Sequence, residues 1–173
     1  MSKRAGNFVT LSEIVDLVGA DNTKFIFLTR KSDSHLDFDI DVVTATSAEN
    51  PVFYVQYANA RINSILANAR EKGVDIEAVD ADSSLLNREE MTLLKKLLVY
   101  PMVLEGASRA FEPHRITFYL QEVAGMFHPY YHKYKVITDD EAMTRTRLAL
   151  CMAIKIVLSD ALLILGITAP EKM

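Results

Sequence analysis

The chain has 173 residues, 50% of them hydrophobic, and a formal net charge of −4. This length fits one domain with a sizeable core, or one domain with part of another. The acidic balance argues against a sequence-independent nucleic-acid binder, so any contact with RNA must come from a local patch. The single cysteine, Cys151, excludes an internal disulfide and fits a reducing compartment. No apolar stretch is long enough for a membrane-spanning helix or a signal peptide.

The first 45 residues differ in character from the rest. The chain opens with MSKRAGNFVTL, a basic loop that contains a Gly-Asn turn. Ser12 is expected to cap a short helix that Gly19 ends, and Asp21 to cap the following helix, NTKFIFLTRK. The next stretch, SHLDFDID, alternates apolar and acidic residues. This alternation predicts an extended segment with three inward-facing side chains: Leu36, Phe38 and Ile40.

From residue 46 onward the sequence predicts long helices. Asn50-Pro51 is a helix start, because a capping side chain is followed by a residue that needs no amide partner there. Apolar residues then recur at three- and four-residue spacing as far as Gly73. Asn87 and Glu90 form a capping box for the next helix, and Pro101 marks a break before another.

Two more long helices complete the chain. One opens after Pro113, and Pro129 is expected to bend or end it. The last runs from about Asp140 to Leu165, where Gly166 stops it. The predicted fold is all-α: a helical bundle of long antiparallel helices joined by short loops.

Residues suited to metal or nucleophilic chemistry are scarce. His128 and His132 are four residues apart, but Pro129 interrupts the helix that would align them. No cysteine or carboxylate stands at ligand spacing from them, so no metal site is expected. No glycine-rich loop of the Walker or Rossmann type is present either. The bundle is therefore interpreted as a recognition module.

Aromatic residues interleaved with cations are the strongest binding signal. They gather at the start of one long helix and near the end of another: Phe53, Tyr54, Tyr57, Tyr130, Tyr131, His132, Lys133, Tyr134 and Lys135. This combination suits single-stranded RNA, whose bases need flat partners and whose phosphates need charge. The other interpretation is that the tyrosines line the bundle with their hydroxyls in water. The residue pattern leaves both open.

Four stretches resemble the arginyl-tRNA synthetases, a class I aminoacyl-tRNA synthetase family. MSKRAGNFVTL is similar to their KMSKS loop without its first lysine, and three more follow in the family's order: SHLDFDID, ENPVFYVQYANARI and LLILGITAPEKM. The resemblance covers essentially the whole chain. It implies that residues 1–45 are the KMSKS loop and a junction segment from the catalytic domain, and that residues 46–173 are an α-helical anticodon-binding domain.

The same resemblance implies an activity. Members of the arginyl-tRNA synthetase family are arginine-tRNA ligases, which join arginine to tRNA-Arg with ATP and Mg²⁺ in the cytoplasm. The family's HIGH-containing nucleotide-binding domain has no counterpart here, so this chain is expected to be a C-terminal piece that does not aminoacylate alone. ATP and arginine are expected as partners of the full-length enzyme only, and no cofactor is expected on this piece. The expected partner is tRNA-Arg, with no membrane and a monomeric state.

Site residues are carried over from the family's motifs. Lys3 resembles the motif lysine that stabilises the pyrophosphate of ATP, a catalytic role that suits a preorganised ammonium. The ATP-binding loop would comprise Met1, Ser2, Lys3 and Arg4. The expected anticodon-binding residues are Tyr54, Tyr57, Asn59, Arg61, Tyr131, Lys135 and Met173.

The roles of these anticodon-binding residues differ. Tyr57 and Tyr131 would stack on bases, Lys135 would meet a phosphate, and Met173 would offer a soft apolar contact and its carboxylate. Asn59 stands where the family commonly has histidine. The alternative function is a helical protein-interaction or assembly module with no RNA role, which the net charge of −4 favours slightly.

Overall fold

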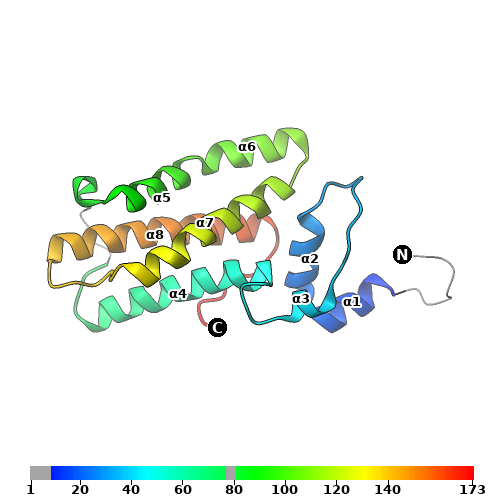
Figure 1. The fold of residues 1–173 in the computed structure, drawn as a ribbon, viewed down its shortest axis with the longest axis horizontal. Coiled ribbons are helices and arrows are strands. Elements are labelled where there is room, and N and C mark those ends of the chain that lie inside the picture. The colour runs from blue at the N-terminus through cyan, green and yellow to red at the C-terminus, as the bar shows by residue number, and fades with distance from the viewer. Residues whose placement is uncertain (1–8, 77–80) are drawn as a thin grey trace.

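The computed structural model describes residues 9–76 and 81–173 of the chain (Figure 1). Within these residues the secondary structure is eight α-helices and one short 3₁₀ helix, Ser83–Leu85, without any strand. The predicted all-α fold is confirmed. None of the helices in the described part of the chain is long and apolar enough to cross a membrane.

Five helices form the main bundle: α4 (Pro51–Glu71), α5 (Arg88–Leu98), α6 (Tyr100–Ala110), α7 (His114–Lys133) and α8 (Glu141–Ile164). In Figure 1, α4, α7 and α8 run side by side along the molecule, and α5 and α6 follow each other as a rod above them. Their apolar faces meet in one core, whose largest fully buried side chains include Ile62, Leu120, Phe127, Leu148 and Leu158. Removing this surface from water is the main force that holds the bundle together.

Three shorter helices precede the bundle: α1 (Leu11–Val18), α2 (Ala20–Leu28) and α3 (Ile40–Thr44). Ile14 and Val18 of α1 and Val43 of α3 form a small separate core at one end of the molecule (Figure 1). Ile26 of α2 packs against this core as a partly buried residue. Phe25 of α2 is fully buried in the main core instead. Helix α2 therefore contacts both cores, and the expected domain division at residue 45 stays a prediction.

The helix boundaries predicted from capping residues are confirmed in the bundle. Asn50 Oδ1 accepts hydrogen bonds from the backbone amides of Val52 and Phe53, at 3.0 and 3.3 Å, directly before Pro51. Asn87 and Glu90 form the reciprocal capping box of α5. Each pair satisfies amides that the first helical turn leaves unpaired.

Two capping predictions for the first helices are wrong. Thr10, not Ser12, caps α1, because Thr10 Oγ1 accepts from the Glu13 amide and the Glu13 carboxylate accepts from the Thr10 amide. Gly19 precedes α2, and Asp21 lies inside the first turn of that helix. The carboxylate of Asp21 instead binds the C-terminal tail, a long-range contact that local sequence does not reveal.

One further expectation fails on local structure, and another fails in part. Ile40 is 43% exposed rather than inward-facing, because Asp39 caps α3 and turns the end of the alternating stretch into a helix. Helix α7 does not end at Pro129 but runs on to Lys133. Pro129 and Gly125 are both exposed, so water can bond the carbonyl that the proline leaves free, while buried Phe127 and Tyr130 hold the helix on the core.

Candidate nucleic-acid interface

The guanidinium of Arg61 lies between two tyrosines from different helices. Its central carbon is 5.2 Å from the ring centre of Tyr57 on α4 and 4.9 Å from that of Tyr131 on α7. It also donates hydrogen bonds to both hydroxyls, with 3.4 Å to that of Tyr131. These contacts join residues 70 positions apart in the sequence, and each cation–π pair stabilises the arrangement by about 0.5–1 kcal/mol where partly exposed.

Further rings extend this cluster along α4. Phe53 stacks on Tyr57 with an interplanar angle of 9° and 5.8 Å between ring centres. His128 lies 4.4 Å from the ring centre of Tyr54 and 5.7 Å from that of Tyr57. We call this surface the α4–α7 aromatic face, and it consists of Phe53, Tyr54, Tyr57, Arg61, His128 and Tyr131.

His128 is held in place as a neutral ring. Its Nε2 lies 3.0 Å from the backbone carbonyl oxygen of Tyr54, to which a neutral imidazole can donate. Burial lowers the pKa of His128 below its usual 6.5, and the positive charge of Arg61 acts in the same direction. The face therefore carries its charge on Arg61, while His128 contributes a flat, uncharged ring at neutral pH.

Asn59 lies behind this face rather than on it. The residue is 1% exposed, its Nδ2 donates to the Pro170 carbonyl at 2.9 Å, and its Oδ1 accepts from the Ser159 hydroxyl at 3.0 Å. Both ends of its amide are thus used inside the protein. The expected direct contact of Asn59 with RNA does not fit this burial, and the geometry supports a role in anchoring the C-terminal tail.

The C-terminal tail, residues 166–173, is tied down by polar contacts from α2 and α4. Asp21 Oδ2 accepts from the Thr168 amide at 3.2 Å and from the Thr168 hydroxyl, and Gln56 Nε2 donates to the Thr168 carbonyl at 2.9 Å. Lys24 Nζ donates to the Gly166 carbonyl at 2.7 Å. The tail thus follows a defined path to Met173, which is 55% exposed at its end.

The remaining expected residues divide into two groups. Tyr54 is half-buried against His128, and Lys135 is exposed just beyond the end of α7. Met1, Ser2, Lys3 and Arg4, the expected ATP-binding loop, lie outside the described residues. Among the residues that the structure does describe, no three histidine, cysteine or acidic side chains cluster in a way that could hold a metal ion.

A buried ion pair holds the segment that carries Lys135. Glu90 is fully buried, and its Oε1 accepts from Arg147 Nε at 2.7 Å. Arg147 Nη1 donates to the Lys135 carbonyl at 2.7 Å, and its guanidinium carbon lies 5.3 Å from the ring centre of Tyr134. The sequence suggested Glu90 as a capping residue only, because nothing in the local pattern pairs it with Arg147.

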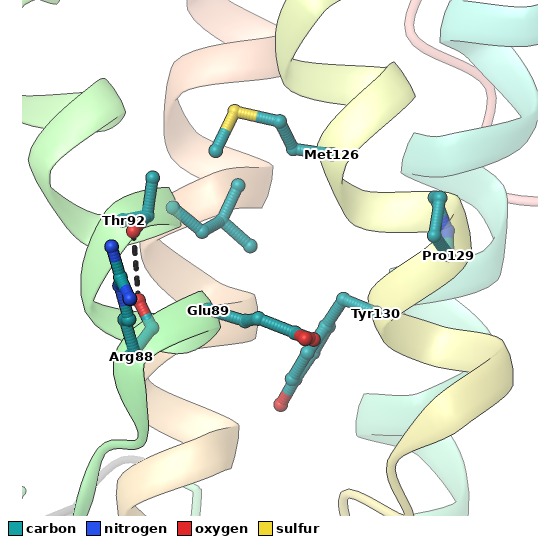
Figure 2. Close-up of a pocket in the computed structure, with 7 residues that line it drawn as sticks. Arg88, Glu89, Thr92, Met126, Pro129 and Tyr130 are labelled. Carbon is teal, nitrogen blue, oxygen red and sulfur yellow. Dashed lines mark hydrogen bonds between the residues drawn. The ribbon is translucent and has the colours of Figure 1, made fainter.

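A cavity of about 470 Å³ lies between α5 and α7, away from the α4–α7 aromatic face (Figure 2). Figure 2 shows Met126, Pro129 and Tyr130 on one side and Arg88, Glu89 and Thr92 on the other. Its lining combines apolar side chains with one acidic and one basic group. It lacks the pairing of stacked rings and cations found on the α4–α7 aromatic face, so it is a weaker candidate for RNA.

Comparison with known proteins decides the family. The model of the DALR anticodon binding domain matches residues 55–173. The chain belongs to the DALR anticodon-binding domain family. The match includes most of α4 and all of α5 to α8, so it contains Tyr57, Arg61, Tyr131 and the C-terminal tail. The predicted resemblance is confirmed for this part of the chain.

Relatives of this DALR protein carry a consistent name. It is 53% identical over 175 residues to the arginine-tRNA ligase of Citrifermentans bemidjiense and 51% identical to that of Geotalea daltonii. These alignments cover 100% of this chain but 32% and 31% of the two relatives. The chain therefore spans about a third of the length of the curated relatives it matches.

Solved structures agree with the fold. A Campylobacter jejuni protein assigned as an arginyl-tRNA synthetase superimposes with a TM-score of 0.88 at 36% identity, over 99% of this chain and 37% of that one. The arginyl-tRNA synthetase of Thermus thermophilus superimposes with a TM-score of 0.79 at 26% identity, over 99% of this chain and 29% of that one. The DALR bundle and the helices before it are thus found together in these enzymes.

Proposed function

We propose that this chain binds the anticodon arm of tRNA-Arg through the α4–α7 aromatic face and the C-terminal tail. The observation that carries the proposal is the position of Arg61 between Tyr57 and Tyr131, which joins a cation to two partly exposed rings. Unstacked bases of an RNA loop can stack on such rings, and a guanidinium can meet a phosphate or a base edge. The DALR match supports the same partner.

The activity of a longer protein is part of this proposal. Relatives named arginine-tRNA ligase, of which the chain covers about a third, support the idea that it works within such an enzyme. That enzyme would use ATP, Mg²⁺ and arginine in the cytoplasm, and Lys3 would stabilise the leaving pyrophosphate. The chain by itself would recognise tRNA and would not aminoacylate.

Substitution of Tyr131 tests the aromatic face. Changing Tyr131 to alanine removes a stacking platform and should weaken binding of a tRNA-Arg anticodon stem-loop by about 1–3 kcal/mol. Changing Tyr131 to phenylalanine keeps the ring and should retain most of the affinity. Fluorescence anisotropy with a labelled stem-loop measures both.

The matched control is Phe118, an aromatic residue of the same helix that is 50% exposed and distant in sequence from the face. Changing Phe118 to alanine should leave RNA affinity unchanged. Equal losses in the Tyr131 and Phe118 variants would refute the assignment of the face. No RNA affinity in the wild-type chain at low salt would favour the alternative, a helical protein-interaction module.

A further inference from the structure

The C-terminal ends of α4 and α7 lie at the same end of the bundle (Figure 1). A groove of about 500 Å³ lies between them. Asn68 and Lys72 line it from the α4 side. The opposite wall comes from the end of α7 and the segment just beyond it, and it includes five consecutive residues: Tyr131, His132, Lys133, Tyr134 and Lys135. We call this the basic groove.

The charge of the basic groove is one-sided. Lys72, Lys133 and Lys135 line it, and no acidic side chain does so among the described residues. Neither Lys72 nor Lys135 forms an ion pair with any residue in the described parts of the chain, whereas Lys133 pairs with Glu89 on α5 at 2.5 Å. In a chain of net charge −4, this is a local concentration of positive charge.

Cations at helix C-termini have an ordinary explanation, because they interact favourably with the helix dipole. That explanation covers Lys133 in the last turn of α7 and Lys72 just after α4. It does not cover Lys135, which lies beyond the helix, or the convergence of all three on one polar groove. A ligand with several negative charges accounts for both.

Tyr131 connects the basic groove to the α4–α7 aromatic face. It lines the groove, and its ring centre lies 4.9 Å from the guanidinium carbon of Arg61. Each nucleotide of an RNA strand carries a base and a phosphate, so a strand that stacks a base near Tyr131 must lead its backbone away from that point. The groove offers the adjacent positive path.

We propose that the basic groove binds the phosphodiester backbone of the RNA strand whose bases reach the aromatic face, with Lys72 and Lys133 as phosphate contacts beside Lys135. The inference rests on the proposed function of that face. Contacts to phosphates fix the position of a strand and carry no sequence information. The groove therefore contributes affinity that is equal for different anticodons.

The test measures RNA affinity of the full chain against salt concentration. The probes are a labelled tRNA-Arg anticodon stem-loop and a matching hairpin with a changed anticodon, followed by fluorescence anisotropy. Lys72→Gln should weaken binding of both RNAs about three- to fivefold at about 0.1 M salt and lower the log–log salt slope by about 0.7–0.9. Lys133→Gln should act in the same direction but less, because Glu89 already offsets part of its charge.

Two control variants complete the design. Lys72→Arg keeps the charge and should retain the wild-type slope. Lys95→Gln removes an exposed lysine of α5 that does not line the groove and should change nothing. If the wild-type chain binds RNA and Lys72→Gln keeps the wild-type salt slope, backbone binding by the basic groove is refuted, while the proposed function of the aromatic face is not. If the wild-type chain binds no RNA, both proposals are refuted.

Discussion

Removal of the Arg147 side chain should strongly destabilise the bundle. Glu90 is fully buried and Arg147 is only 12% exposed at its side chain, so their 2.7 Å contact is shielded from water. The second carboxylate oxygen of Glu90 is already used by the Asn87 amide at 2.9 Å. Arg147→Ala thus leaves a carboxylate in the core without its cation, which costs about 3–5 kcal/mol.

The expected loss is large enough to measure in two ways. For a chain of this size, it corresponds to a fall in melting temperature of about 6–20 °C, at about 2–4 °C per kcal/mol. Urea unfolding followed by far-ultraviolet circular dichroism gives the free energy of unfolding directly. Arg145→Ala is the matched control, since Arg145 lies on the same helix but forms an exposed pair with Glu141, which stabilises by about 0–1 kcal/mol.

A second substitution separates the buried charge from lost packing. Glu90→Gln keeps the capping box, because glutamine can serve at the same position, and removes the charge. Added to Arg147→Ala, it should recover part of the lost stability, because no unpaired carboxylate remains in the core. A double variant less stable than Arg147→Ala, or an Arg147→Ala variant as stable as Arg145→Ala, would refute this reasoning.

Three further outcomes are expected. Asn59→Ala should loosen the tail at Pro170 and speed the release of Met173 by carboxypeptidase, whereas Asn63→Ala, which loses only a bond within α4, should not. Burial raises the pKa of the Cys151 thiol to about 12, so a thiol reagent such as DTNB should react with it only in denaturant. Burial lowers the pKa of His128, so the unfolded chain takes up its proton first and the free energy of unfolding should fall from about pH 7 to pH 5. Urea titrations across that range should show a flatter dependence in His128→Gln, and an unchanged dependence would contradict the assignment.

Local sequence rules predicted most of the bundle. The start of α4 at Asn50-Pro51 and the Asn87–Glu90 box follow from side chains that bond amides two or three residues away, so short stretches contain all the information. The same rules misplaced Asp21, whose partner Thr168 is 147 residues away. They also do not predict that α7 continues past Pro129, where packing of the flanking residues outweighs the missing backbone bond.

The candidate site was predicted in part. Tyr57, Arg61 and Tyr131 were named from the resemblance, and the structure brings their side chains into contact. The sequence presents His128 only as a possible metal ligand, since its ring contacts with Tyr54 and Tyr57 depend on how α7 lies against α4. The position of Lys72 in the basic groove also cannot be predicted from local sequence, because the groove exists only where two helix ends meet.

The most direct measurement is the affinity of the chain for two anticodon stem-loops that differ in one base. One carries the tRNA-Arg anticodon, and the other has its middle base changed. Anisotropy titration at low salt should give binding to the first that weakens as salt rises, and clearly weaker binding to the second. Equal affinity for the two would contradict anticodon recognition by the α4–α7 aromatic face.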